Sequence, residues 1–164
     1  MPKMRLYSAR WIYVIALCLV FLCAAFIFKM SHESKEVSSN RSSTIADKVA
    51  DSAIKDFDTK TKTERIRTIL KIEHILRKTA HFCIYATLGA LLTFASLWHS
   101  RTWIAHGLIT LLIGTLYAAS DELHQSFIPG RGPLFTDVIL DSAGVLCGAL
   151  VMLAFAGVWL RRKS

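Results

Sequence analysis

The ionisable side chains that could do chemistry gather in three short segments of the sequence, each at the edge of a long apolar stretch. They include carboxylates, histidines, a lysine and an arginine, which can bind anions, accept hydrogen bonds from hydroxyl groups or move protons. Charged groups beside hydrocarbon are costly to maintain, so their grouping predicts a functional site. The candidate residues are Lys78, His81, Tyr85, Asp121, Glu122, His124, Gln125, Arg131, Asp137 and Asp141.

Within each segment, a spacing of three or four residues places polar side chains on one face of a helix. Two of the faces also carry glycines, whose small size lets a neighbouring helix approach closely in a membrane. A simpler interpretation exists for Asp137, which follows Thr136 and could cap a helix. The three faces consist of Lys78, His81, Tyr85 and Gly89; Tyr117, Asp121 and His124; and Asp137, Asp141, Gly144 and Gly148.

Two pairs of charged residues lie near expected helix ends whose partial charge has the same sign as their own. Lys78 and His81 lie near the expected start of a helix, whose partial positive charge disfavours cations. Asp121 and Glu122 lie near the expected end of another helix, whose partial negative charge disfavours anions. Bringing the two ends together would relieve both effects, and Arg131 could join from a turn rich in proline and glycine. We therefore predict mutual contacts among Lys78, His81, Asp121, Glu122, His124 and Arg131.

Four apolar stretches provide the helices that must position these side chains. They cover residues 11–28, 81–98, 103–120 and 138–160, in a chain with 53% hydrophobic residues. Each stretch is close to the ~20 residues that a helix needs to cross a ~30 Å hydrocarbon core. A barrel strand would instead alternate apolar and polar residues. The sequence therefore predicts an all-α, polytopic membrane protein that forms a bundle of four transmembrane helices.

The first apolar stretch could be a secretory signal or a membrane anchor, and the loop after it combines a linker with amphipathic helices. A basic leader before an apolar run also begins a secretory signal, but this run is long enough to remain as an uncleaved anchor. The loop opens with a Ser-rich stretch around residues 38–43, which is typical of a linker. Amphipathic helices containing Ile45 and Val49, and then Ile66 and Leu70, should lie on the membrane or across the bundle. The expected segments are 1–28, 29–76, 77–160 and 161–164.

The charge pattern indicates a membrane partner and an orientation. The net charge of +8 comes from basic residues beside the spans, which attract anionic lipids and need no nucleic acid to explain them. Both tails are basic without acids, which predicts cytoplasmic tails, whereas the long loop, with twelve Lys/Arg and eight Asp/Glu of its own, favours the opposite orientation more weakly. The long loop and the polar segments would then share the extracytoplasmic face of the cell membrane. The four cysteines lie in apolar runs without a CxxC pair, so we predict no disulfide framework. We expect no cofactor, with a divalent metal as the alternative.

Three sequence motifs carry a resemblance to a known family. The first runs from Arg77 to Gly89, the second from Ser120 to Arg131, and the third from Asp137 to Gly144. In this order they resemble the VanZ-like family of bacterial membrane proteins, over most of the chain after the first span. That family takes its name from a protein associated with low-level resistance to the glycopeptide teicoplanin. The resemblance therefore implies four spans, a cell-envelope setting and lowered glycopeptide susceptibility, but no particular reaction.

Three functions are compatible with these residues. In the first, Arg131, Lys78 and His81 contact the phosphate or carboxylate of a membrane lipid or lipid-linked cell-wall precursor, while Asp121 and Glu122 contact hydroxyls. In the second, the protein is a hydrolase or transferase that uses a divalent metal held by His81, Asp121, Glu122 and His124. In the third, it is a small proton-coupled transporter. We favour the first, because the sequence lacks a zinc signature, an activated nucleophile and internal repeats.

Overall fold

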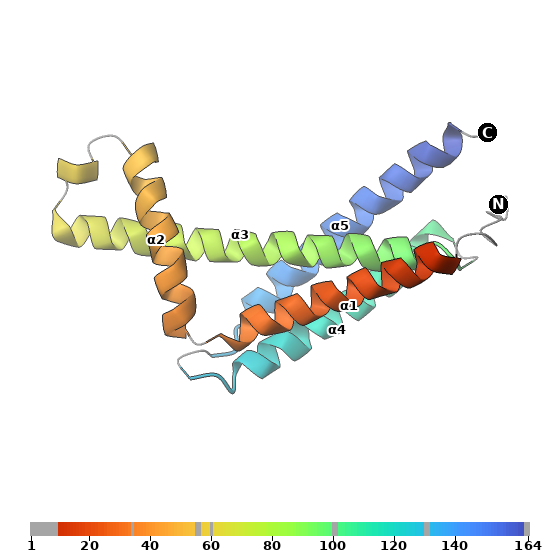
Figure 1. The fold of residues 1–164 in the computed structure, drawn as a ribbon, viewed down its shortest axis with the longest axis horizontal. Helices are drawn as coiled ribbons and strands as arrows, with labels where there is room; N and C mark the ends of the chain where they lie inside the picture. Colours follow the sequence, from red (N-terminus) through yellow and green to blue (C-terminus); the bar gives the residue numbers. More distant parts are fainter. Residues whose placement is uncertain are drawn as a thin grey trace.

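The computed structural model describes residues 10–33, 35–54, 57–59, 61–99, 102–129 and 132–162, and the regular structure in these ranges is entirely helical (Figure 1). The elements are α1 (Arg10–His32), α2 (Lys35–Ala53), the 3-10 helix η1 (Phe57–Thr59), α3 (Lys62–Ser96), α4 (Trp103–Gln125) and α5 (Phe135–Arg161). Four of them, α1, α3, α4 and α5, are long and apolar enough to cross a membrane. The predicted all-α fold with four spans is confirmed.

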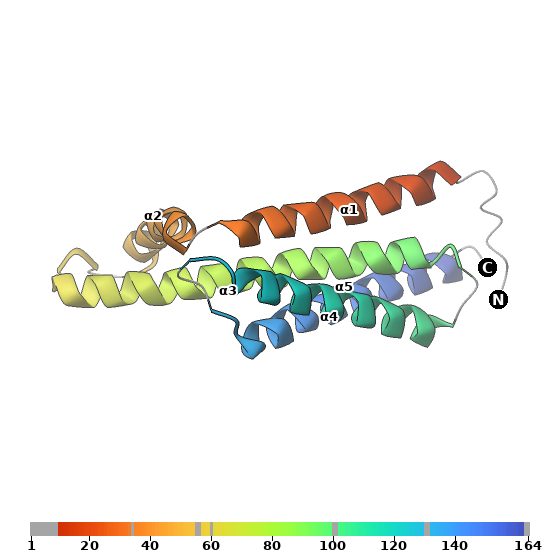
Figure 2. The ribbon, with the colours of Figure 1, turned by 90° about the horizontal axis from the view of Figure 1, so that it is seen from below.

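The four long helices form a bundle in which α3 contacts each of the other three (Figure 2). Helices α1 and α4 run in one direction and α3 and α5 in the opposite direction, so the start of α1 and the end of α5 lie at the same end (Figure 1). Large apolar side chains cover the outside, with Phe21 73% and Phe155 66% exposed. Exposed apolar surface of this extent is expected where a bundle faces lipid.

Helix α3 is longer than predicted, because the second amphipathic segment of the loop and the second span form one continuous helix. It begins at a capping box, in which Thr61 and Glu64 each accept a hydrogen bond from the other's backbone N–H. No glycine or proline interrupts residues 62–88, so nothing ends the helix before the span. Lys78 and His81 therefore lie inside α3, where the expected helix-dipole penalty does not arise.

Helix α2 crosses α3 beyond the end of α1 (Figure 1). The Ser-rich stretch that we expected to be a linker is helical and lies in α2, where the Ser42 hydroxyl donates a 2.9 Å hydrogen bond to the Ser38 carbonyl. Bonds of this kind to the preceding turn accommodate hydroxyl side chains within a helix. Ala46 and Ala50 are fully buried, whereas Ile45 of the predicted apolar stripe is 51% exposed. Small side chains allow the two helices to cross closely, so the packed face is the alanine face.

Glycines bring α3 and α5 into backbone contact. A Cβ atom on Gly148 of α5 would lie 1.8 Å from the carbonyl oxygen of Ala86, and one on Gly89 of α3 would lie 2.2 Å from the carbonyl oxygen of Val145. Gly144 makes a similar approach to the α3 backbone one turn earlier. No side chain fits at these positions. The prediction that Gly144 and Gly148 let a neighbouring helix approach closely is therefore confirmed.

Gly148→Ala should destabilise the bundle, because the added methyl group would overlap the Ala86 carbonyl group and push α3 away from α5. Overpacking of this kind costs about 1–3 kcal/mol. Gly157→Ala is the matched control on the same helix, since its added Cβ would meet no described neighbour within 4 Å. Thermal unfolding of the purified protein in detergent should show a lower Tm for Gly148→Ala only. Equal Tm values for the two variants would contradict the close approach.

Candidate functional site

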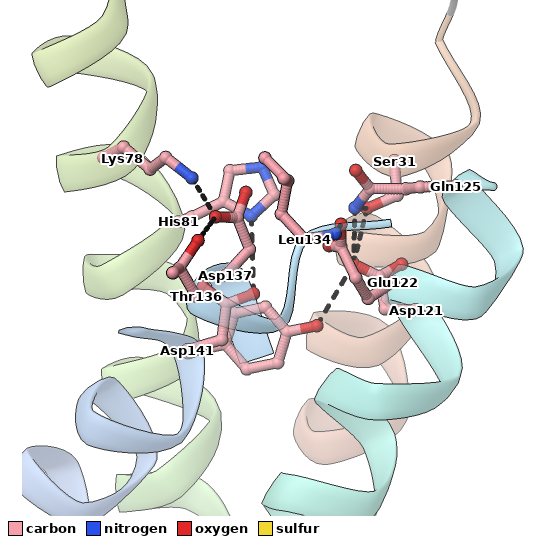
Figure 3. Close-up of polar contacts among 11 residues, drawn as sticks. Ser31, Lys78, His81, Asp121, Glu122, Gln125, Leu134, Thr136, Asp137 and Asp141 are labelled. Atoms are coloured by element: carbon pink, nitrogen blue, oxygen red, sulfur yellow. Dashed lines mark hydrogen bonds and ion pairs between the residues drawn. The ribbon is translucent and has the colours of Figure 1, made fainter. Parts of the chain in front are cut away.

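Two ion pairs join α3 and α5 near the end of the bundle where α1 and α4 finish (Figure 3). The Lys78 ammonium group pairs with the Asp137 carboxylate. One turn further along both helices, His81 Nδ1 lies 3.7 Å from Asp141 Oδ2. Because α3 and α5 run parallel and the glycine contacts set their register, the polar stripe of one helix meets the acidic stripe of the other.

Asp121 of α4 is the centre of a second network, which joins three helices. Its Oδ2 atom accepts hydrogen bonds from Ser31 Oγ of α1 at 2.8 Å, from Gln125 Nε2 at 3.1 Å and from the Tyr85 hydroxyl of α3 at 3.2 Å (Figure 3). Asp121 is only 4% exposed and Tyr85 is fully buried. Burial disfavours a carboxylate, and several donors on one oxygen offset that effect. The network therefore holds α1, α3 and α4 together around one carboxylate.

Glu122, the next residue on α4, holds the start of α5. Its Oε1 atom accepts a 2.8 Å hydrogen bond from the backbone N–H of Leu134, the N-cap residue of α5. Leu134 cannot cap the helix with an apolar side chain, and no side-chain cap bond is formed there among the described residues. Asp137 also does not serve as the N-cap, because it lies within the first turn and its carboxylate contacts Lys78 and the Thr136 hydroxyl.

His124 and Tyr117 face α1 instead of the ion pairs. The His124 ring stacks on Phe28 with ring centroids 4.5 Å apart, and its Nε2 lies 3.2 Å from Nδ1 of His32. The Tyr117 hydroxyl donates a 2.6 Å hydrogen bond to the carbonyl of Ala24. These contacts place α1 against α4 along the side of the bundle. The polar groups of α4 thus contribute to helix packing as well as to the candidate site.

The expected single charge network is therefore divided. Lys78 and His81 pair with acids of α5 rather than with Asp121 and Glu122, because the glycines bring α5 closest to this part of α3. His124 contacts α1, on the other side of α4. Arg131, the remaining member of the predicted network, lies outside the described residues.

A half-open pocket of about 160 Å³ lies between α3, α4 and α5. The partly exposed lining carries basic side chains of α3, with Arg77 30% and Lys78 25% exposed, together with Asp137, the partner of Lys78, which is 23% exposed. The acids deeper in the pocket are buried, with Glu122 6% and Asp141 2% exposed. The pocket therefore has basic side chains and one ion-paired acid in its more exposed part, and two buried acids in its interior. It is lined by six of the predicted site residues, namely Lys78, His81, Glu122, Gln125, Asp137 and Asp141.

The sequence pattern does not identify several residues of the site. His74 and Arg77 line the pocket one turn before Lys78 and His81. The spacing of three and four residues was the available signal, but it required the helix to begin well before the span. Ser31 donates to Asp121 across 90 residues of sequence, and no local pattern marks it.

The metal ligands expected for a metal-dependent enzyme are dispersed. His81 faces Asp141, and His124 faces His32. Asp121 Oδ2 is occupied by three hydrogen-bond donors. Over the described ranges, no group of three or more His, Cys, Asp or Glu side chains is placed to hold a metal ion. The geometry supports hydrogen bonding and ion pairing at this site.

No curated protein and no solved structure matches the chain. A family model described as VanZ/LLP1 matches residues 11–156, which include nearly all of the four membrane-length helices and every polar group described above. Because this match covers most of the chain, the protein, whose four long helices are suited to cross a membrane, belongs to the VanZ/LLP1 family.

Proposed function

We propose that the protein binds the anionic headgroup of a cell-envelope lipid, or of a lipid-linked cell-wall precursor, in the pocket between α3, α4 and α5. The observation that carries this proposal is the row of His74, Arg77 and Lys78 on the α3 wall at the pocket opening. Arginine and lysine bind phosphate and carboxylate groups through charge-assisted hydrogen bonds. The start of α5 on the opposite wall adds the positive end of a helix, where one backbone N–H is already bonded to Glu122.

The basic side chains are held in position before any ligand arrives. Arg77 lies 3.7 Å from Glu73 on the preceding turn, and Lys78 pairs with Asp137. Glu73 is buried, while both basic side chains remain partly exposed at the pocket. A headgroup can therefore contact each cation while its carboxylate partner stays in place. Such positioning reduces the entropy lost on binding.

The size of the pocket limits the ligand to a headgroup. Its volume of about 160 Å³ is well below the range of about 300–1,000 Å³ that is typical of sites that enclose drug-sized molecules. A phosphate with a small attached group can enter, whereas acyl chains must remain outside in the bilayer. Apolar side chains at the start of α5 provide a surface for such chains, since Leu134 is 53% and Phe135 is 78% exposed.

The position of the pocket in the bundle indicates the side of the membrane on which it opens. The start of α1 and the basic end of α5, with Arg161 and Arg162, lie at the end opposite to the pocket (Figure 1). Basic residues next to membrane spans favour the cytoplasm, so the pocket would open on the extracytoplasmic side. Cell-wall precursors and the targets of glycopeptides are found on that side. We therefore propose both that the protein lowers glycopeptide susceptibility and that headgroup binding is the route.

The double variant Arg77→Gln/Lys78→Gln should bind phosphatidic acid at least ten-fold more weakly than the wild type. Hydrogen bonds to charged groups contribute about 1.5–3 kcal/mol each, and about 1.4 kcal/mol corresponds to ten-fold. The matched control, Arg67→Gln/Lys71→Gln, removes the same charge from exposed positions of α3 outside the pocket. Native mass spectrometry of protein from phosphatidylcholine nanodiscs with graded phosphatidic acid would measure the retained lipid.

Equal losses in the two double variants would show general attraction to an anionic surface and overturn the proposal. His74→Gln provides a second test, because Lys78→Gln leaves Asp137 without its cation and could impair folding. His74 is exposed and lines the pocket. Its substitution should reduce phosphatidic acid retention at an unchanged Tm.

In a host where the wild type lowers teicoplanin susceptibility, Arg77→Gln/Lys78→Gln should restore susceptibility, because the headgroup would no longer be held. Arg67→Gln/Lys71→Gln should behave as the wild type. Minimum inhibitory concentrations would be compared at matched protein levels in membranes. Full protection by the pocket variant would separate the resistance effect from this pocket.

Single cysteines test on which side of the membrane the pocket lies. Cysteines placed at Ser39 and Ser126 should react with a membrane-impermeant maleimide on intact cells, and one at Ser164 only after permeabilisation. Mass-tag gel shifts would measure the labelling. Reaction at Ser164 alone would place the pocket in the cytoplasm and contradict the extracytoplasmic ligand. The background requires replacement of the native cysteines Cys18, Cys23, Cys83 and Cys147.

A further inference from the structure

We infer that the lipid held in this pocket carries a free hydroxyl group on the hydrocarbon side of its phosphate, as a monoacylated glycerophospholipid does. This inference rests on the proposed function and specifies the class of headgroup. The proposed function explains the basic opening of the pocket, but it leaves the buried acid at its floor, Asp141, without a role.

Asp141 has an unused hydrogen-bonding position. It lines the pocket and is 2% exposed. Its Oδ2 atom faces His81 Nδ1 at 3.7 Å, whereas its Oδ1 atom is buried and receives no hydrogen bond from the residues that the structure describes. An unpaired buried carboxylate oxygen is unfavourable, and a ligand that donates a hydrogen bond would remove that penalty. Asp121 Oδ1 is also unpaired, but Asp121 does not line the pocket.

The neighbouring protein donors are already engaged elsewhere. The Tyr85 hydroxyl, one turn beyond His81 on α3, donates to Asp121. The Lys78 ammonium group pairs with Asp137, nearer the pocket opening. Because neither of these described donors is available to Asp141 Oδ1, a molecule bound in the pocket can supply the hydrogen bond.

The order of residues along α3 determines which part of a lipid reaches Asp141. From Arg77 to His81 the helix rises about 6 Å, at 1.5 Å per residue. Along α3, His81 is closer than Arg77 to the apolar part of the helix, and its partner Asp141 lies at the same depth as His81. A phosphate bound at Arg77 and Lys78 would therefore have Asp141 about one helical turn deeper, towards the hydrocarbon core.

The depth of Asp141 below the phosphate determines which classes of lipid can donate a hydrogen bond to it. An amine or sugar attached to the phosphate extends towards water, away from Asp141. The groups on the hydrocarbon side are the glycerol carbons and their substituents. In a diacyl lipid these carry ester oxygens, which only accept hydrogen bonds and are disfavoured beside a carboxylate. A monoacyl lipid has a free hydroxyl there, which can donate to Asp141 while the phosphate contacts the basic side chains.

The experiment compares 1-oleoyl lysophosphatidic acid with its 2-deoxy analogue, which has the same chain and phosphate but no hydroxyl. Both are titrated into the full-length protein in phosphatidylcholine nanodiscs, and retention is measured by native mass spectrometry. The wild type should bind the hydroxylated lipid at least ten-fold more tightly, equivalent to about 1.4 kcal/mol. It should also prefer this lipid to dioleoyl phosphatidic acid.

Variants assign the preference to one carboxylate. Asp141→Ala should bind the two monoacyl lipids equally, because the acceptor is gone. Asp137→Ala is the matched control: Asp137 also lines the pocket, but it pairs with Lys78 nearer the opening. Its affinities for the two lipids should change together and keep their ratio. Asp141→Asn preserves the shape of the side chain, and its preference should fall below that of the wild type even if Asp141→Ala does not fold.

The outcomes distinguish this inference from the proposed function. Failure to retain any phosphate lipid above the phosphatidylcholine background would refute both. Equal retention of the hydroxylated and 2-deoxy lipids by the wild type would leave the phosphate site intact and overturn the hydroxyl inference. A wild-type preference that persists in both Asp141 variants would place the hydroxyl at another residue and also overturn it.

Discussion

The backbone contact between α3 and α5 is the constraint on which the candidate site depends. Gly89 on one helix and Gly144 and Gly148 on the other leave no room for side chains between the two backbones. Helices at this separation cannot shift along one another without steric overlap, so their register is set. That register places Lys78 beside Asp137 and His81 beside Asp141. The chemistry at one end of the bundle therefore follows from packing nearer its centre.

The Asp121 network joins the other two spans to this pair of helices. Ser31 of α1, Tyr85 of α3 and Gln125 of α4 all donate to one carboxylate oxygen. In hydrocarbon, apolar side chains have little preference for each other over lipid, and polar contacts between helices contribute to association. Glu122 extends the arrangement by holding the start of α5. The acids of α4 thus hold together the helices that form the pocket, and Glu122 also lines it with Asp137 and Asp141 of α5.

The distribution of charge within the pocket determines how a bound ligand would be oriented. Basic side chains of α3 lie at the opening, and Asp141 lies at the buried floor. A buried charge needs a partner or a hydrogen bond, whereas a charge at the opening can be hydrated. A ligand with an anionic group and a deeper hydroxyl matches both conditions. This match is the basis for the proposal that the pocket selects one class of anionic lipid.

The sequence by itself determined the four spans, the polar stripes and the role of Gly144 and Gly148, because apolar length and helical spacing are local properties. Only the tertiary structure decided which stripes meet. The sequence pattern places Lys78 and His81 at a helix start and predicts that they pair with α4. Because α3 continues back to Lys62, the premise of that pairing does not hold. The glycine contacts instead pair them with α5. Ser31 could not be identified from sequence, because its role depends on a helix docked from a distant part of the chain.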